Sequence, residues 1–386
     1  MKTSPKALVF ASLIACAFQT PFAQADIALS DQVDFVGDIR GGYFFRQRDQ
    51  RNGKHNNTDE FRLRVRTGLE WQMNEQWSSR VRVAGRYNTI EQNTLFSFDN
   101  NAMASGNLAM GNSSIDELFV QYREDKLQLR VGRFQTKFEL QGVARKSLDR
   151  NNSPNTEINW TDGLHLSYEV GENGWVSHFI AEHNRGQNGP AQFRSAPLGF
   201  ADEGSRWSYY TGLENNRKHG AIVQRSIGIS FLPDSLYKYG PATPVTDNYS
   251  TLVGRLAAEW PVSDQGMSFL LAGEAGYAPN TPTETTSLVG TGSESGHYAW
   301  QVTANLMSFV PNHNIGFVVA HADAGWLLSP DFSPNQNAYE IRHQWKINKQ
   351  SKLESRLRYR EDDKDVTGSI QDREDFGGYV RYTYKF

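Results

Sequence analysis

The stretch EFRLRVRTGLEWQ, residues 60 to 72, constrains the fold more than any other feature, because it alternates between two kinds of side chain. A period of two is that of a β-strand, whose successive side chains point to opposite faces. One parity carries Phe61, Leu63, Val65, Leu69 and Trp71, and the other carries Arg62, Arg64, Arg66, Glu70 and Gln72. The stretch predicts a strand with one apolar face and one arginine-rich face.

The same alternation recurs along the chain, with turn residues between the copies. It predicts about sixteen strands; fourteen and eighteen stay open, because 206–214 and 221–232 alternate least clearly. The predicted strands are 34–48, 60–72, 77–87, 115–123, 127–138, 159–170, 175–184, 206–214, 221–232, 249–260, 267–278, 297–308, 314–321, 338–347, 352–360 and 376–386. Each has near the ten residues that a tilted strand needs to cross a bilayer.

The connections between these strands alternate between short and long. Short turns such as MNEQ and EDK are followed by long polar connections, and tryptophans flank several of the short turns. The long connections are 49–59, 89–114, 139–158, 185–205, 233–248, 279–296, 322–337 and 361–375. This pattern predicts an all-β fold: a transmembrane antiparallel up-and-down β-barrel with short periplasmic turns, long extracellular loops and an aromatic girdle.

The first 25 residues differ from the rest and have the three parts of a secretory signal. Lys2 and Lys6 precede the apolar run ALVFASLIACAF, and AQA stands ahead of Asp26. We expect cleavage after residue 25 and a single barrel domain over 26–386; a lipoprotein signal acylated at Cys16 is the alternative. Without the signal, the chain has 38 basic and 43 acidic side chains and a net charge of -5.

The sequence shows no pattern typical of catalysis. Cys16 is the only cysteine, so the mature chain would have no disulfide, no thiol nucleophile and no cysteine-bound zinc. His178 and His183 are five residues apart on a predicted strand and so lie on opposite faces. No Ser/His/Asp or paired-carboxylate arrangement stands out, and we expect no catalytic residue, no metal site, no cofactor and no nucleic-acid partner.

The arginines indicate what the polar face contacts. Same-face neighbours on a strand are about 7 Å apart, where two arginines repel by about 0.6 kcal/mol in water and by several times more in a dry core. The polar face should therefore line water. Because a closed barrel pairs its last strand with its first, the basic strands of both chain ends join into one wall.

We call this arginine set the basic track, and we expect it to line the pore and attract anions. In the alternative interpretation, Glu70, Glu117, Glu340, Glu354 and loop acids neutralise it. The basic track consists of Arg40, Arg46, Arg48, Arg62, Arg64, Arg66, Arg80, Arg82, Arg86, Arg130, Arg342, Arg356, Arg358, Arg360 and Arg381.

A long loop that folds inward would set the narrowest point of such a pore. The basic candidate is VARKSLDRNN, residues 143–152, with Arg145, Lys146 and Arg150. The acidic loop 361–375 is expected to stay outside, where it would hold divalent ions near lipopolysaccharide or simply be solvated. The last strand, FGGYVRYTYKF, ends in Phe386 and resembles the C-terminal signature by which outer-membrane proteins meet the barrel-assembly machinery.

Three segments carry a family resemblance: RLRVRTGLEWQMNEQWSSRVRVAG, IDELFVQYREDKLQLRVGRFQTKF and NWTDGLHLSY. Over residues 35–170 the chain resembles bacterial outer-membrane porins of the alginate-export and phosphate-selective kind. The resemblance implies a single-chain barrel whose basic pore passes anionic solutes or an acidic polysaccharide. It carries the arginine-rich pore wall over to Arg62, Arg64, Arg66, Arg80, Arg82 and Arg130. A periplasmic gating loop and a lysine-rich phosphate site have no match.

The pattern and the resemblance together predict a porin of the Gram-negative outer membrane that passes small anionic solutes. The alternatives are an exporter of an acidic polysaccharide, an adhesin or structural barrel, and a barrel enzyme. The expected partners are outer-membrane lipid and lipopolysaccharide, the barrel-assembly machinery and the anionic solute. The sequence leaves a homotrimer open, because the outer wall is apolar in either case.

Overall fold

The computed structural model describes residues 27–90, 92–95, 114–149, 161–184, 198, 206–239 and 244–386. The predicted signal peptide at 1–25 and Arg150 lie outside these described residues. The described part includes one short helix, α2 (Glu284–Ser287). No helix within the described ranges is long and apolar enough to cross a membrane.

Sixteen long strands of the described residues form the wall, and the two least clear segments are strands β10 and β11. The prediction of about sixteen strands is confirmed. Their bounds are β2 (Val33–Asp49), β3 (His55–Gln72), β4 (Trp77–Asn88), β6 (Ile115–Glu124), β7 (Leu127–Phe134), β8 (Thr161–Val170), β9 (Trp175–Asn184), β10 (Arg206–Asn215), β11 (Ile222–Tyr239), β12 (Pro244–Pro261), β13 (Ser268–Tyr277), β14 (Tyr298–Val310), β15 (His313–Ala322), β16 (Gln336–Lys346), β17 (Ser351–Asp362) and β18 (Glu374–Lys385).

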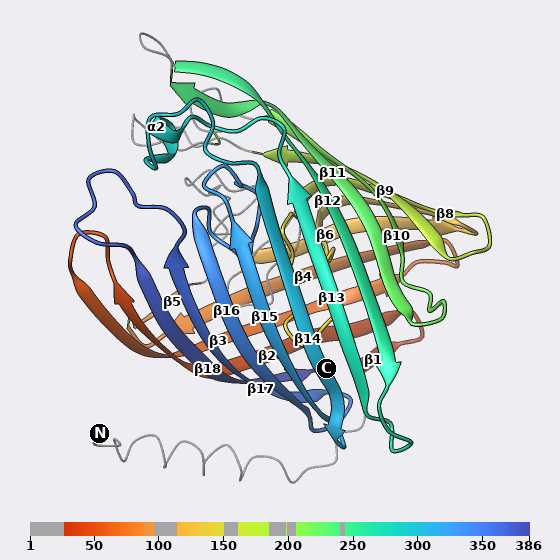
Figure 1. Ribbon diagram of the computed structural model, residues 1–386. Helices are drawn as coiled ribbons and strands as arrows, with labels where there is room; N and C mark the ends of the chain where they lie inside the picture. Colours follow the sequence, from red (N-terminus) through yellow and green to blue (C-terminus); the bar gives the residue numbers. More distant parts are fainter. Residues whose placement is uncertain are drawn as a thin grey trace.

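The wall closes on itself (Figure 1). Each long strand pairs antiparallel with its neighbours along the chain, and β18 pairs with β2 from Glu374 opposite Asp49 to Lys385 opposite Asp38. Two short strands add to the sheet: β1 (Ile27–Ser30) pairs with β2, and β5 (Asn93–Leu95) pairs with β4. Closure satisfies the backbone groups of both terminal strands, so the sheet has no open edge. The predicted antiparallel β-barrel is confirmed.

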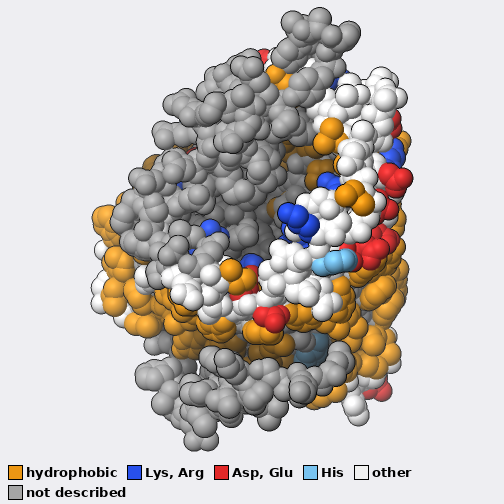
Figure 2. Space-filling model, turned by 90° about the vertical axis from the view of Figure 1, so that its left-hand side faces the viewer, with side chains coloured by type: hydrophobic (Ala, Val, Ile, Leu, Met, Phe, Trp, Pro, Cys, Tyr) orange, Lys and Arg blue, Asp and Glu red, His pale blue; other side chains and the backbone are white. Residues whose placement is uncertain are grey.

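The two parities of each strand face different surroundings. On β3, Val65, Leu69 and Trp71 are exposed on the outer side, whereas Arg64 is buried on the inner side. Figure 2 shows hydrophobic side chains covering much of the outside of the wall. Short turns join the strands at one end, and the longer connections lie at the other end, which we call the long-loop end.

Three of the predicted segments have boundaries that were wrong by four residues or more. Strand β3 begins at His55, inside the predicted connection 49–59, because residues 55–59 still pair with β2. The predicted loop 233–248 continues β11 and β12 as a hairpin, because its alternating residues keep pairing after a register shift between Leu232 and Leu236. The predicted strand 127–138 leaves the wall after Phe134. Residues 135–149, which we call the inner segment, pass into the lumen, where Phe138 packs with Ile180 and Tyr210.

A second loop also fills part of the lumen. Residues 323–335, between β15 and β16, bring Trp326, Leu328 and Phe332 into one buried cluster with Leu148 of the inner segment. Tyr249 of β12 donates its hydroxyl hydrogen to Gly325 O at 2.9 Å. These contacts fill the lumen beside β11–β16, so the core of this barrel lies inside it.

Candidate functional site

Closure of the barrel brings arginines from both ends of the chain onto neighbouring strands. Gly42 of β2 lies opposite Arg62 on β3 and Arg381 on β18, and Gly377 of β18 lies opposite Arg358 on β17. A Cβ atom on Gly42 would lie 3.1 Å from the Cβ atom of Arg381. Glycine at such inward positions leaves the space in which the neighbouring arginine side chains lie.

A cavity of about 590 Å³ lies against this wall, toward the long-loop end. Its lining includes the ring of Phe44 on β2 and Ser333 of the second lumen loop. The charged lining consists of Arg46, Arg48, Arg62, Arg356, Arg358, Arg360 and Arg373, with Glu60 and Asp375. Positive groups therefore outnumber negative groups by seven to two in this lining.

One carboxylate holds several of these arginines in place. Asp375 accepts two hydrogen bonds from Arg46, at 2.9 and 2.8 Å, one from Arg48 at 2.8 Å and one from Arg360 at 3.1 Å. Arg373 lies 3.9 Å away. Arg373 lies equally near Asp362, at 3.8 Å, so the charge of Asp375 is shared mainly by the three hydrogen-bonded arginines, and this cluster stays cationic.

Two arginines of the cavity have weaker acidic contacts. Arg356 lies 4.0 Å from Glu340, and no carboxylate of the described residues lies within ion-pair distance of Arg358. The guanidinium of Arg356 lies over the ring of Tyr379, with 4.4 Å between the guanidinium carbon and the ring centroid. Such stacking holds the charge in place without neutralising it.

Most of the other arginines of the basic track are paired with acids. Arg64 and Arg66 donate to Asp38 at 2.9 and 2.6 Å, and Arg82 donates twice to Asp116 at 3.0 and 2.9 Å. Acidic partners also contact Arg80 (Glu70 and Glu117), Arg381 (Glu354) and Arg342 (Glu340). Arg40 and Arg130 donate to the neutral side chains of Thr383 and Gln121, and Arg86 lies opposite Arg64 on β3. The track is thus divided into a largely paired part and the cationic cavity.

The inner segment contains two of the three residues of the predicted constriction, Arg145 and Lys146, and their side chains point in different directions. Arg145 remains exposed and pairs with Glu139 at 3.2 Å. Lys146 points the other way, into the wall, where its Nζ lies 3.0 Å from Glu340 Oε2. Burial lowers the pKa of Lys146 to about 8, and burial raises the pKa of Glu139. Arg150 lies outside the described residues.

Hydrogen bonds attach the end of the inner segment to the wall and to the second lumen loop. Leu148 N–H donates to the Glu274 carboxylate at 3.1 Å, and Asp149 pairs with Arg255. Trp326 Nε1–H donates to Leu148 O at 2.9 Å. Sequence reasoning missed this attachment, although the apolar run GWLLSP within a long connection is a signal of it.

The histidines lie as their spacing predicted. His178 faces the lumen, where its two ring nitrogens lie 3.1 Å from His165 Nε2 and 3.2 Å from Glu214 Oε1. His183 lies on the outer side beside Trp207, with 5.3 Å between the ring centroids. The spacing argument that placed the two on opposite faces is confirmed.

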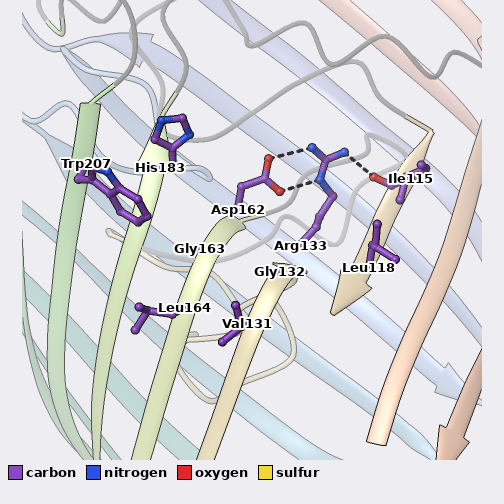
Figure 3. A pocket seen from close by; sticks show the side chains of 10 residues that line it. All are labelled: Ile115, Leu118, Val131, Gly132, Arg133, Asp162, Gly163, Leu164, His183 and Trp207. Carbon is purple, nitrogen blue, oxygen red and sulfur yellow. Dashed lines mark hydrogen bonds and ion pairs between the residues drawn. The ribbon is translucent and has the colours of Figure 1, made fainter. Parts of the chain in front are cut away.

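A second cavity, of about 710 Å³, indents the outer side of the wall across β6–β10 (Figure 3). Leu118, Val131 and Leu164 form its apolar part. Arg133 donates to both carboxylate oxygens of Asp162, at 2.7 and 2.8 Å, and to Ile115 O. This neutral pair is a polar exception on a face that is otherwise mostly apolar.

Searches against models of protein families and against curated proteins found no match. Among solved structures, OprB of Pseudomonas putida superposes with a TM-score of 0.60 at 12% identity, over 92% of this chain and 94% of that chain. OccAB3 of Acinetobacter baumannii superposes with a TM-score of 0.51 at 12% identity, over 91% and 99%. At such identities the likeness concerns the fold. This chain has the fold of the bacterial outer-membrane porins.

Proposed function

We propose that this protein is a channel of the bacterial outer membrane that passes small anionic solutes along the arginine-rich side of its lumen. The observation that supports this most directly is the cavity beside β17, β18, β2 and β3, with seven arginines against two carboxylates. The porin fold supports the transport part of the proposal, and the charge of the cavity supports the anionic part.

The excess of arginine acts on a solute through its electric field. Low-dielectric walls focus the field of charges that line a narrow space, which raises the local concentration of anions. Salt screens this attraction over about 8 Å at physiological ionic strength, so it acts inside the cavity and at its mouth. An anion entering from the long-loop end would meet Arg46, Arg48 and Arg373 before Arg62 and Arg356.

The two lumen-filling loops indicate where the solute would pass. They occupy the lumen beside β11–β16, and the inner segment also packs Phe138 and Leu140 against the wall between β7 and β13. The exposed side chains of the inner segment, Lys137 and Arg145, are also cationic. The proposed path therefore runs between the inner segment and the arginine-rich wall.

The location of the protein is part of the proposal. Export through the signal at 1–25 and contact with lipopolysaccharide remain predictions, and so do trimer formation and assembly through Phe386. The last residue does contribute to closure: its ring stacks on Phe35 with 5.3 Å between centroids, and Gly37 N–H donates to Phe386 O at 2.7 Å.

The test is a reversal potential measured across a planar bilayer under a KCl gradient. We expect anion preference, which the double variant Arg62→Gln/Arg358→Gln should weaken, because both side chains line the cavity. The control Lys218→Gln/Lys349→Gln removes the same charge from exposed turns at the short-turn end. Cation preference of the unmodified protein, or an equal effect of both double variants, would contradict the proposal.

A further inference from the structure

We propose that His321, Asp323 and Asp363 form a binding site for a divalent cation of the zinc type, at the long-loop end of the outer wall. His321 lies at the end of strand β15, Asp323 lies at the start of the second lumen loop, and Asp363 lies in the connection after β17. One ligand atom from each lies within 4.8 Å of the other two. The site is separate from the arginine-lined cavity and does not depend on the proposed function.

The hydrogen bonds of His321 direct one ring nitrogen toward a carboxylate. Its Nδ1–H donates to Asn337 Oδ1 at 2.9 Å, and Asn337 Nδ2 donates to Asp363 Oδ1 at 3.3 Å, which fixes the orientation of the amide. Nε2 then faces Asp323 Oδ1 at 3.1 Å. Either a proton on Nε2 or a metal ion between Nε2 and Oδ1 makes this contact attractive, and only a metal ion would also bind the second carboxylate, that of Asp363.

Among the described residues, the carboxylates of Asp323 and Asp363 share a single basic side chain within ion-pair distance, which is His321 itself. The preceding residue, Asp362, shows the contrast, because it pairs with Arg51 at 2.7 Å and lies 3.8 Å from Arg373. Within the described residues, the carboxylates of Asp323 and Asp363 therefore lack the arginine partners that balance the carboxylate of Asp362.

The donor set selects the class of metal. One imidazole nitrogen with two carboxylate oxygens suits zinc and its neighbours in the transition series better than calcium or magnesium, which prefer oxygen alone. Ligands about 2.0–2.1 Å from a tetrahedral zinc ion are about 3.3 Å apart, close to the 3.1 Å between His321 Nε2 and Asp323 Oδ1. Asp363 Oδ1 lies 3.5 Å from the other ring nitrogen, Nδ1, so the Asp363 side chain must turn toward Asp323 to join an ion held at Nε2.

The surroundings hold these ligands in position. Asp323 Oδ2 accepts a hydrogen bond from Tyr298 N–H at 2.8 Å, and the His321 ring stacks on Trp300 with 6.1 Å between centroids. Asn337 orients the histidine through its second nitrogen, as outer partners of zinc ligands do. A bound ion would join the start of the second lumen loop to the connection that follows β17.

The experiment uses the full-length protein, folded in detergent micelles and freed of metal by a chelator, and titrates it calorimetrically with Zn²⁺ alone. We expect one site whose affinity falls at least about tenfold in His321→Asn and in Asp363→Asn. Asp363 lies in a connection and its side chain is 22% exposed, so its variant should fold even if the histidine variant does not. Co²⁺ in place of Zn²⁺ should give visible absorption bands that both variants lose.

A matched control comes from a pair of histidines elsewhere on the outer wall. His313 Nδ1 lies 3.0 Å from His343 Nε2, so this pair is another candidate for zinc binding among the described residues. His343→Asn should bind Zn²⁺ as the unmodified protein does. The proposal is overturned if the unmodified protein does not bind Zn²⁺, since a proton alone then balances the cluster. It is also overturned if Asp363→Asn binds as tightly as the unmodified protein.

Discussion

Lys146 Nζ lies 3.0 Å from Glu340 Oε2, and the two side chains are only 3% and 2% exposed. This ion pair joins the inner segment to strand β16 on the inner side of the wall. Glu340 also accepts a hydrogen bond from Arg342 at 2.9 Å. Among the described residues, this carboxylate is the only acidic group within ion-pair distance of Lys146 and of Arg342, so the two members of the Lys146–Glu340 pair are not equivalent.

We expect Glu340→Gln to destabilise the barrel by about 3–5 kcal/mol, because it leaves buried cations without their acid. Lys146→Met should cost less than about 1 kcal/mol, because Glu340 keeps Arg342 and the ammonium group is no longer buried. Urea unfolding in micelles measures both free energies. A larger loss for Lys146→Met than for Glu340→Gln would show that the lysine is the essential member.

The buried ammonium group predicts a pH dependence. Burial lowers the pKa of Lys146 to about 8 from the ordinary value of 10.5, so the folded protein loses this proton first as the pH rises. Between these values the unfolded state binds more protons, and stability rises with pH. Relative to Lys146→Met, the unmodified protein should gain about 2–4 kcal/mol from pH 8 to pH 10.5. A difference in unfolding free energy between the two proteins that stays constant from pH 8 to pH 10.5 would contradict this prediction.

Gly132 on β7 has a backbone that disfavours side chains. Its φ is +125°, and an added Cβ atom would lie 2.3 Å from Leu118 O on β6. Gly132→Ala should therefore cost about 1–3 kcal/mol or more. Gly254→Ala is the control, because nothing lies within 4 Å of its added Cβ atom, and its effect should stay within about 0.5 kcal/mol. Chemical unfolding of both variants provides the comparison.

Trp326 should contribute more to stability than a tryptophan of the outer wall. It is fully buried, and its ring fills the space above Gly276, where an added Cβ atom would lie 2.3 Å from the ring. Trp326→Ala should cost about 3–5 kcal/mol. Trp260→Ala is the control: Trp260 is 42% exposed on the outer side, so its substitution should lower the free energy of unfolding in micelles by less. Equal losses would mean that the second lumen loop is not part of the core.

Most of the wall could be predicted from the sequence, because a period of two is a local property of each strand. The alternation of 60–72 predicted both the strand and the direction of its side chains, and closure followed from the cost of an open sheet edge. The end of β7 at Phe134 could not be predicted in this way. Phe138 and Leu140 continue the alternation, and only their contacts with Ile180 and Val223 show that they lie inside the lumen.

The sequence by itself determined that arginines of both chain ends gather on one polar wall, because closure places β18 beside β2 whatever the loops do. The tertiary structure decided which of them remain unbalanced. Arg64 meets Asp38 from the neighbouring strand, whereas Arg358 lies opposite Gly377 on β18. Such pairing depends on register and side-chain direction across strands, and in the same way His321 meets Asp363 only because β15, β16 and β17 are adjacent.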